Sequence, residues 1–216
     1  MANCSSCSAP LLANNQVCRY CGLRNDVDLK GKHDYSTLSI DSGRICPECK
    51  TQLQTIELQK LLQIERCQSC YGLFFDPGEI ETLLDVSVAP VFSINLDLIT
   101  NINQDRYSID RSIKYQACPV CQVLMNRVSF GYRSGVVVDK CRQHGVWLGG
   151  GEISHLLEWK RAGGQLLAQQ YQQHRTEKKP IRTVGHTDNS YRSSSTSNTE
   201  LEALGSVLDI VANLFD

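Results

Sequence analysis

The chain has 216 residues, enough for one ordinary domain or for several very small ones. Its 22 Lys and Arg residues nearly balance 23 Asp and Glu residues, so the formal charge of −1 excludes a bulk attraction to nucleic acid or acidic lipid. The first residues, MANCSSCSAP, lack the basic and apolar regions of a secretory signal, and no apolar stretch is long enough to span a bilayer. We therefore expect a cytoplasmic protein without membrane contacts.

Ten of the eleven cysteines fall in five pairs with two residues between their members, and His144 follows Cys141, the eleventh, at the same offset. An odd number is awkward for a disulfide framework, and in a reducing compartment such pairs are more commonly metal ligands. With His144 as the twelfth donor, the pairs make three sets of four, the number that tetrahedral zinc takes; iron in the all-cysteine sets is the alternative. The predicted ligands of three Zn²⁺ ions are Cys4, Cys7, Cys18 and Cys21; Cys46, Cys49, Cys67 and Cys70; and Cys118, Cys121, Cys141 and His144.

In chain order, residues 1–25 are predicted to form an N-terminal zinc ribbon, and residues 26–43 a linker. Residues 44–86 follow as the first zinc-finger repeat, in which TIELQKLLQIER predicts a β-hairpin with a tight turn between the ligand pairs. Residues 87–115 connect to the next repeat, and the alternation of Ile94, Leu96 and Leu98 with polar residues predicts short strands there.

Residues 116–175 are predicted to be the second zinc-finger repeat, extended by a helix. Its hairpin is indicated by the alternation of Val128, Phe130 and Tyr132, with a turn at 133–135. The helix is expected from near Gly151 to about Arg175, with a weak point at the glycine pair 163–164 because glycine is a poor helix former.

The sequence GVWLGGGEISHLL repeats YGLFFDPGEIETLL when the two are aligned from Gly145 and Gly72, and CPVC matches CPEC upstream. This indicates an internal duplication. The glycine run at 149–151 is therefore not a phosphate loop, because the first copy has Asp76 and Pro77 there and neither copy has the Gly-Lys-Ser/Thr of such loops.

The duplication also predicts how each copy packs. Glu79 and Glu152 are expected in the first turn of a helix, where the helix dipole favours an acid. The leucine pairs that follow in each copy, at 83–84 and 156–157, are expected to face back onto the ribbon, with Phe74 and Trp147 as their main apolar contacts.

The segments CPEC…CQSCYGLFFDPGEIETLL and CPVC…CRQHGVWLGGGEISHLL resemble the transcription-factor-IIB-type zinc-finger domain (zf-TFIIB) of many bacterial proteins. The resemblance covers residues 44–86 and 116–160. It implies zinc binding and a ribbon fold, without implying transcription initiation. The second copy departs from the pattern in having His144 for a cysteine and one residue fewer before its glycine. Residues 1–25 resemble only a generic zinc ribbon.

The end of the chain is predicted to be a disordered linker, residues 176–198, followed by an amphipathic helix, residues 199–216. The linker is polar and rich in serine, and the helix begins with the capping box of Thr199 and Glu202 and carries an apolar stripe. Two interpretations remain open. The helix either folds back on the ribbons or is a tethered contact for a protein partner or for self-association.

Together these elements predict a small, metal-stabilised α+β protein. It would consist of three zinc-ribbon modules built from β-hairpins and zinc knuckles, with helices after the second and third modules and an amphipathic C-terminal helix. Each module alone is too small to bury much apolar surface, so we expect structural zinc, at about 10–16 kcal/mol, to decide whether it folds.

The expected function is that of a zinc-binding scaffold that contacts a protein partner, with residues 199–215 as one candidate contact. Four protein ligands leave a zinc ion no open position, so we expect no enzyme, no catalytic residue and no further cofactor. The alternative is a transcription-related, nucleic-acid-associated zinc-ribbon protein. It would use residues 118–179, where nine Lys and Arg residues stand against four acids.

Overall fold

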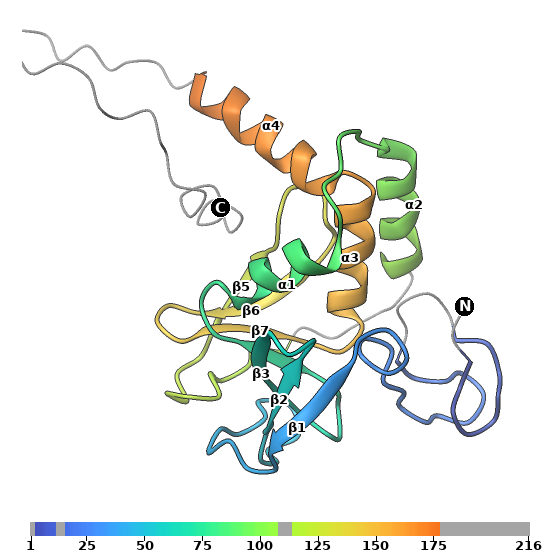
Figure 1. Ribbon diagram of the computed structural model, residues 1–216, viewed down its shortest axis with the longest axis vertical. Helices are drawn as coiled ribbons and strands as arrows, with labels where there is room; N and C mark the ends of the chain where they lie inside the picture. The colour runs from blue at the N-terminus through green and yellow to red at the C-terminus, as the bar shows by residue number, and fades with distance from the viewer. Residues whose placement is uncertain (1–2, 12–15, 108–113, 178–216) are drawn as a thin grey trace, which may run out of the picture.

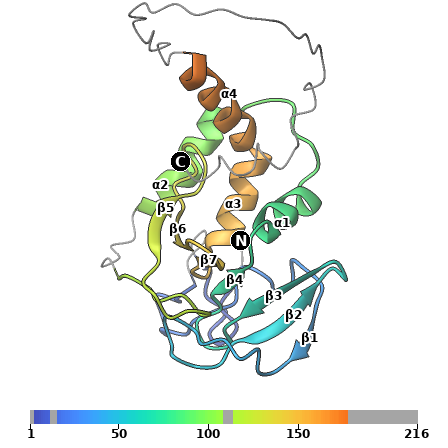
Figure 2. The same cartoon turned by 90° about the vertical axis from the view of Figure 1, so that its left-hand side faces the viewer.

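The computed structural model describes residues 3–11, 16–107 and 114–177. Seven strands form one antiparallel sheet in the order β1-β2-β3-β4-β7-β6-β5, and the helices gather on one side of it (Figures 1 and 2). This confirms the predicted α+β class. The strands are β1 (Tyr35–Ser39), β2 (Gln54–Leu58), β3 (Leu62–Arg66), β4 (Leu73–Phe75), β5 (Asn126–Ser129), β6 (Val137–Cys141) and β7 (Gly145–Leu148). The helices among the described residues are α1 (Glu79–Ser87), α2 (Leu96–Tyr107), α3 (Glu152–Arg161) and α4 (Gly164–Glu177).

Residues 44–86, here called the first ribbon, and residues 116–161, the second ribbon, have matching strand registers. The predicted hairpins are both present, as β2–β3 and β5–β6. In the first ribbon Gln54 lies opposite Arg66, the residue before Cys67. In the second, Asn126 lies opposite Lys140, the residue before Cys141.

The two ribbons join through the pairing of β4 with β7. Phe74 and Trp147, which occupy the same position in the aligned sequences, lie directly opposite one another in this pair. Leu73 pairs with Leu148, and Phe75 pairs with Val146. Each ribbon therefore contributes equivalent positions to the pairing. A local two-fold axis at the Phe74–Trp147 pair therefore relates the ribbons, and the sheet is continuous across both.

One hydrophobic core fills the space between the sheet and the helices, and it draws on both ribbons. The predicted leucines of α1 and α3 are buried in it as expected. They contact the strand face that carries Leu73 and Phe75, because alternate residues of a strand point to opposite faces. Phe74 and Trp147 belong to a separate cluster with the metal-type cysteines. The expected contact of these two aromatic residues with the leucines is therefore wrong.

Two segments differ from their predictions. Residues 87–115 contain the helix α2 rather than short strands. Asn95 caps this helix by accepting the backbone N–H of Leu98 at 2.9 Å, while Ile99 is buried and Leu96 is 47 % exposed. The alternation therefore did not mark a buried strand face. Within the predicted linker 26–43, residues 35–39 form the edge strand β1.

The predicted weak point of the long helix is confirmed. Helix α3 ends at Arg161 and α4 begins at Gly164. Gly163 has a φ of +86°, and a Cβ there would lie 2.3 Å from the carbonyl oxygen of Ser93. The predicted C-terminal helix, residues 199–216, and all but the first two residues of the predicted linker 176–198 lie outside the described residues.

The N-terminal module, which in the structure includes the residues up to Leu29, packs against the start of α3, and the small residue Gly150 leaves space for it. This module contains two turns closed by single bridges, at 3–10 and 17–24, and no strand among its described residues. A Cβ on Gly150 would lie 1.1 Å from Nε2 of Gln16. The buried Asp28 accepts the backbone N–H of Gly151 at 2.5 Å and that of Ser154 at 2.9 Å. Asp28 therefore caps α3 from outside the helix.

Replacing Gly145 by alanine tests the junction of the ribbons. A Cβ at Gly145 would lie 2.0 Å from the carbonyl oxygen of Phe75, and the φ of +118° adds strain. We expect Gly145→Ala to lower the free energy of unfolding by more than about 3 kcal/mol in urea titrations. The matched control is Gly43→Ala, because Gly43 has a φ of +72° and open space around it. The control should cost only about 1–2 kcal/mol. Equal losses would contradict the close approach of β7 to β4.

Candidate metal centres

The structure brings the twelve predicted donors into three groups of four. Within each group the donor atoms all lie within 4.8 Å of one another. Four donors around zinc, with zinc–sulfur bonds of 2.3 Å, would stand about 3.8 Å apart. The sulfurs of Cys4 and Cys21 are 3.5 Å apart, and those of Cys121 and Cys141 are 3.8 Å apart. Each group could therefore hold a zinc ion, and all eleven cysteines are free of disulfides.

The groups are, in chain order, site one (Cys4, Cys7, Cys18, Cys21), site two (Cys46, Cys49, Cys67, Cys70) and site three (Cys118, Cys121, Cys141, His144). Outside these groups, the part of the chain that the structure describes contains no further cluster of three metal-type donors.

Five of the six donor pairs each lie on a backbone turn of the same type, here called a knuckle. In the knuckle that begins at Cys46, the N–H of Cys46 donates to the carbonyl of Thr51 at 2.8 Å. The N–H of Lys50 donates to the carbonyl of Cys46 at 3.0 Å. Lys50 adopts a φ of +60° to close the turn. This geometry aims both sulfurs at one point. The residues at the position of Lys50 in the other knuckles are Ser8, Gly22, Tyr71 and Gln122, all with positive φ.

The sixth pair, Cys141 and His144, uses a turn that is one residue shorter. Gly145 already pairs with Cys141 in the β6–β7 ladder and has a φ of +118°. Nδ1 of His144 nevertheless lies 3.4 Å from the sulfur of Cys141 and 3.9 Å from that of Cys118. The longer histidine side chain therefore reaches the position that a cysteine reaches from the longer turn.

Backbone N–H groups and burial set the charges of the clustered thiols. The N–H groups of Cys7 and Ser6 lower the pKa of Cys4 to about 6. Burial raises the pKa of Cys118 to about 11. Within a site the sulfurs are close enough for S–H···S contacts, as between Cys4 and Cys21 at 3.5 Å and between Cys121 and Cys141 at 3.8 Å. A divalent cation favours the thiolate form of every member, so these clusters suit a metal ion better than they suit protons.

Sites two and three share an apolar environment on the sheet face opposite the helices. Phe74 and Trp147 are at most 2 % exposed and lie in one cluster with cysteines of both sites. Leu53 and Met125 complete this cluster. The two metal positions are therefore parts of a single body, whereas site one belongs to the N-terminal module.

Glu79 and Glu152, which align in the two motifs, each close the turn that follows a knuckle. Oε2 of Glu79 accepts the N–H of Asp76 at 2.7 Å, and Oε2 of Glu152 accepts the N–H of Gly149 at 2.9 Å. Both acids lie in the first helical turn, as predicted. Their hydrogen bonds close the turn before the helix. The favourable position of an acid in the helix dipole does not by itself predict this role. Burial raises the pKa of Glu79 to about 7.

Sequence reasoning missed the residues that support the clusters. Nδ2 of Asn25 lies 3.7 Å from the sulfur of Cys4, and its Oδ1 accepts the N–H of Ser5 at 2.9 Å. Arg44 donates to Glu65 at 2.6 Å and to Asp76 at 2.9 Å, and its guanidinium lies 5.3 Å from the centre of the Phe74 ring. No sequence signal marks them, because they act through contacts that only the fold creates.

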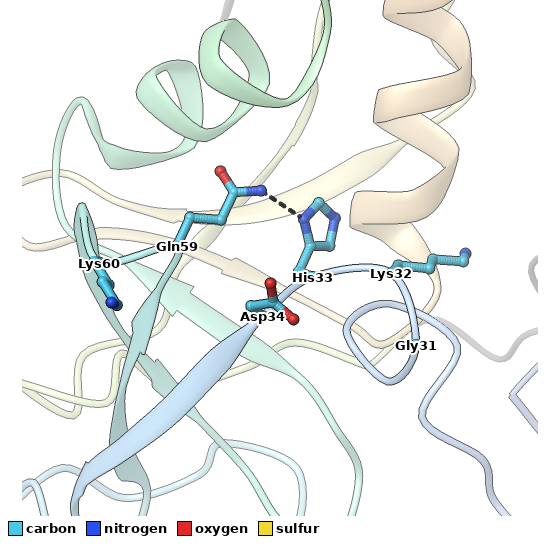
Figure 3. A pocket seen from close by; sticks show the side chains of 6 residues that line it. All are labelled: Gly31, Lys32, His33, Asp34, Gln59 and Lys60. Atoms are coloured by element: carbon cyan, nitrogen blue, oxygen red, sulfur yellow. Dashed lines mark hydrogen bonds between the residues drawn. The ribbon is translucent and has the colours of Figure 1, made fainter.

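A hollow of about 560 Å³ opens beside β2 and the segment before β1 (Figure 3). Nε2 of Gln59 donates to Nδ1 of His33 across 3.2 Å. Burial, followed by the charges of Lys32 and Arg161, lowers the pKa of His33, so the imidazole is neutral near pH 7. Lys32, which also lines the hollow, donates to the hydroxyl of Ser154 at 2.7 Å.

Residues 45–86 match one copy of the model of the family described as transcription factor zinc-finger. This range is the first ribbon with site two and α1. No curated protein and no solved structure matches the chain. Among the described residues, no helix combines the length and apolarity needed to cross a bilayer.

The different burial of the sites predicts the order in which they lose zinc. In site one Cys7 and Cys21 are exposed, whereas in site two three of the four cysteines are at most 1 % exposed. We expect native mass spectrometry of the purified protein to show three zinc ions. A strong chelator should remove one ion first, and this fast phase should vanish in the double variant Cys7→Ser, Cys21→Ser. A single phase for all ions would contradict the distinction.

Proposed function

We propose that the protein is a cytoplasmic zinc-dependent scaffold that binds a protein partner, and that its second ribbon is a second copy of the domain at residues 45–86. The observation that carries this proposal is the composition of the clusters. Each offers four protein donors to one ion. An ion held in this way has no position left for water or substrate, which supports a structural role for the ions and a protein that is no enzyme.

Exposed apolar residues on the knuckles support a protein-binding role. Val123 and Leu124, directly beside site three, are 64 % and 67 % exposed. Tyr20 and Leu23 lie on a knuckle of site one and are 78 % and 41 % exposed. Large apolar side chains on rigid, metal-fixed turns are suited to docking against another protein, since their contact costs little conformational entropy.

The charges of the second ribbon favour a protein over nucleic acid. Lys160 forms an ion pair with Asp85, and Arg127 lies opposite Asp139 in the β5–β6 ladder. These cations are partly neutralised by neighbouring acids, which leaves fewer of them for phosphates. Residues 199–215 are the second proposed protein contact, and their charged side chains are all acidic.

Acidic substitution of the site-three knuckle tests the protein contact. We expect the tagged double variant Val123→Asp, Leu124→Asp to lose proteins that the unaltered chain captures from its own cell extract, as measured by quantitative mass spectrometry. The control is Leu61→Asp, because Leu61 is 60 % exposed on the turn between β2 and β3. Removal of residues 199–216 is a separate arm. Identical capture by all variants, with zinc content unchanged, would reject the proposal.

Nucleic-acid binding has an equally direct test. The zinc-loaded full chain should not shift a labelled duplex or a labelled single strand at about 50 mM salt, where phosphate contacts are strong. A shift that disappears steeply as salt is raised, and that is weakened by Arg142→Glu, would favour the nucleic-acid alternative instead.

A further inference from the structure

The N-terminal module docks in a notch formed by both ribbons. On one side of this first notch, Arg66 of the first ribbon pairs with Asp26 at 2.5 Å, with side chains that are only 8 % and 5 % exposed. On the other side, Asp28 accepts two backbone N–H groups at the start of α3. Of these two aspartates, which one residue separates, Asp26 binds the guanidinium of Arg66 and Asp28 binds the free backbone N–H groups at the start of α3.

The local two-fold axis creates a second notch of the same construction. Arg66 pairs with Leu73 in the β3–β4 ladder, and Lys140 pairs with Val146 in the β6–β7 ladder. Lys140 therefore stands where Arg66 stands in the first notch. The start of α1 correspondingly takes the place of the start of α3, with Glu81 at the position of Ser154.

This second notch is a cavity of about 230 Å³ in the structure. Its walls are the first turn of α1 and the turn between β6 and β7. Pro77 and Gly78 are exposed there, whereas Gly150 and Gly151 are buried beneath the N-terminal module. Nothing among the described residues fills the second notch in the way that the N-terminal module fills the first.

Glu81 indicates what the cavity lacks. This residue lines the cavity, is only 9 % exposed, and its Oε2 has no hydrogen-bond partner within the described structure. A buried polar oxygen without a partner destabilises the fold, and a hydrogen-bond donor from a ligand would remove that cost. In the first notch the small Ser154 leaves room for the carboxylate of Asp28, whereas Glu81 brings a carboxylate of its own.

We propose that the second notch binds an extended peptide segment of a partner protein. The segment carries an acidic side chain for Lys140 and Arg142 and, two residues later, an amide or hydroxyl group that donates to Glu81. This inference rests on the proposed protein-binding function and names one contact of it. A second N-terminal module is excluded as the occupant, because its Asp28 would meet the carboxylate of Glu81, and Pro77 fills the space that Gly150 leaves for Gln16.

The spacing of the proposed ligand comes from the first notch. Asp26 contacts the cation and Asp28 the helix start, so the equivalent ligand needs its acid and its donor two residues apart. The simplest probe is the capped peptide of residues 24–30 with asparagine in place of Asp28, Arg-Asn-Asp-Val-Asn-Leu-Lys.

The experiment titrates this peptide into the ¹⁵N-labelled, zinc-loaded full chain and follows backbone amide shifts. We expect saturable shifts at Gly78, Glu81 and Arg142. The unaltered peptide, which has Asp28, should bind at least about tenfold more weakly because it opposes one carboxylate with another. Glu81→Ser should reverse this preference, since it reproduces Ser154. Arg142→Glu should weaken both peptides, with zinc content and unfolding midpoint as controls.

Several results would overturn the inference. They are an absence of saturable shifts, equal binding of both peptides to the unaltered protein, or shifts confined to residues 149–154. If removal of residues 199–216 alone moves the amides of the second notch, the chain's own C-terminal segment is the occupant and the partner peptide is rejected. If the peptides fail while Val123→Asp, Leu124→Asp still loses its captured partner, the proposed function stands without this contact.

Discussion

The pairing of β4 with β7 is the interaction on which the remaining structure depends. The last strand of each ribbon, β4 or β7, would have one unpaired edge if the ribbon stood alone. A ribbon of this size also buries too little apolar surface to be stable alone. Joining the two edges satisfies the backbone groups of both and places Leu73 and Phe75 beside Val146 and Leu148. The helices then cover one continuous apolar face rather than two small ones.

This junction changes the role expected of the metal ions. Judged as isolated modules, the ribbons would depend on zinc for folding itself. Together they have a core that includes Phe130, Trp159 and the leucines of α1 and α3, all away from the sulfur clusters. Sites two and three occupy the other face of the sheet, around Phe74 and Trp147. Zinc there would fix the knuckles and the β4–β7 register, while the core supplies much of the remaining stability. Site one lacks such a core nearby, since its cluster contains only a few apolar residues.

The sequence predicted best the features that repeat at fixed spacing. The twelve donors, the two hairpins and the glutamates after the knuckles all follow from short motifs whose geometry is local. Three features could not be predicted in this way. Strand β1 has an almost wholly exposed pattern, so no alternation marked it. Helix α2 is specified by the cap at Asn95 against a misleading alternation of Leu96 and Leu98. Asp28 acts on a helix that begins more than a hundred residues later, a contact that depends on the assembled fold.

The differences between the ribbons have a common explanation in the first notch. Two units with identical side chains, related by a two-fold axis, would present two equivalent notches, and any segment that fits one would fit the other. The N-terminal module is present once per chain, so only one notch can receive it. Gly150 and Ser154 provide the space that this docking requires, whereas Pro77 and Glu81 close the same space in the first ribbon. Pro77 and Glu81 therefore leave no room for the module in the second notch and do not fill the cavity beside Lys140, so the two ribbons keep one backbone framework around different side chains.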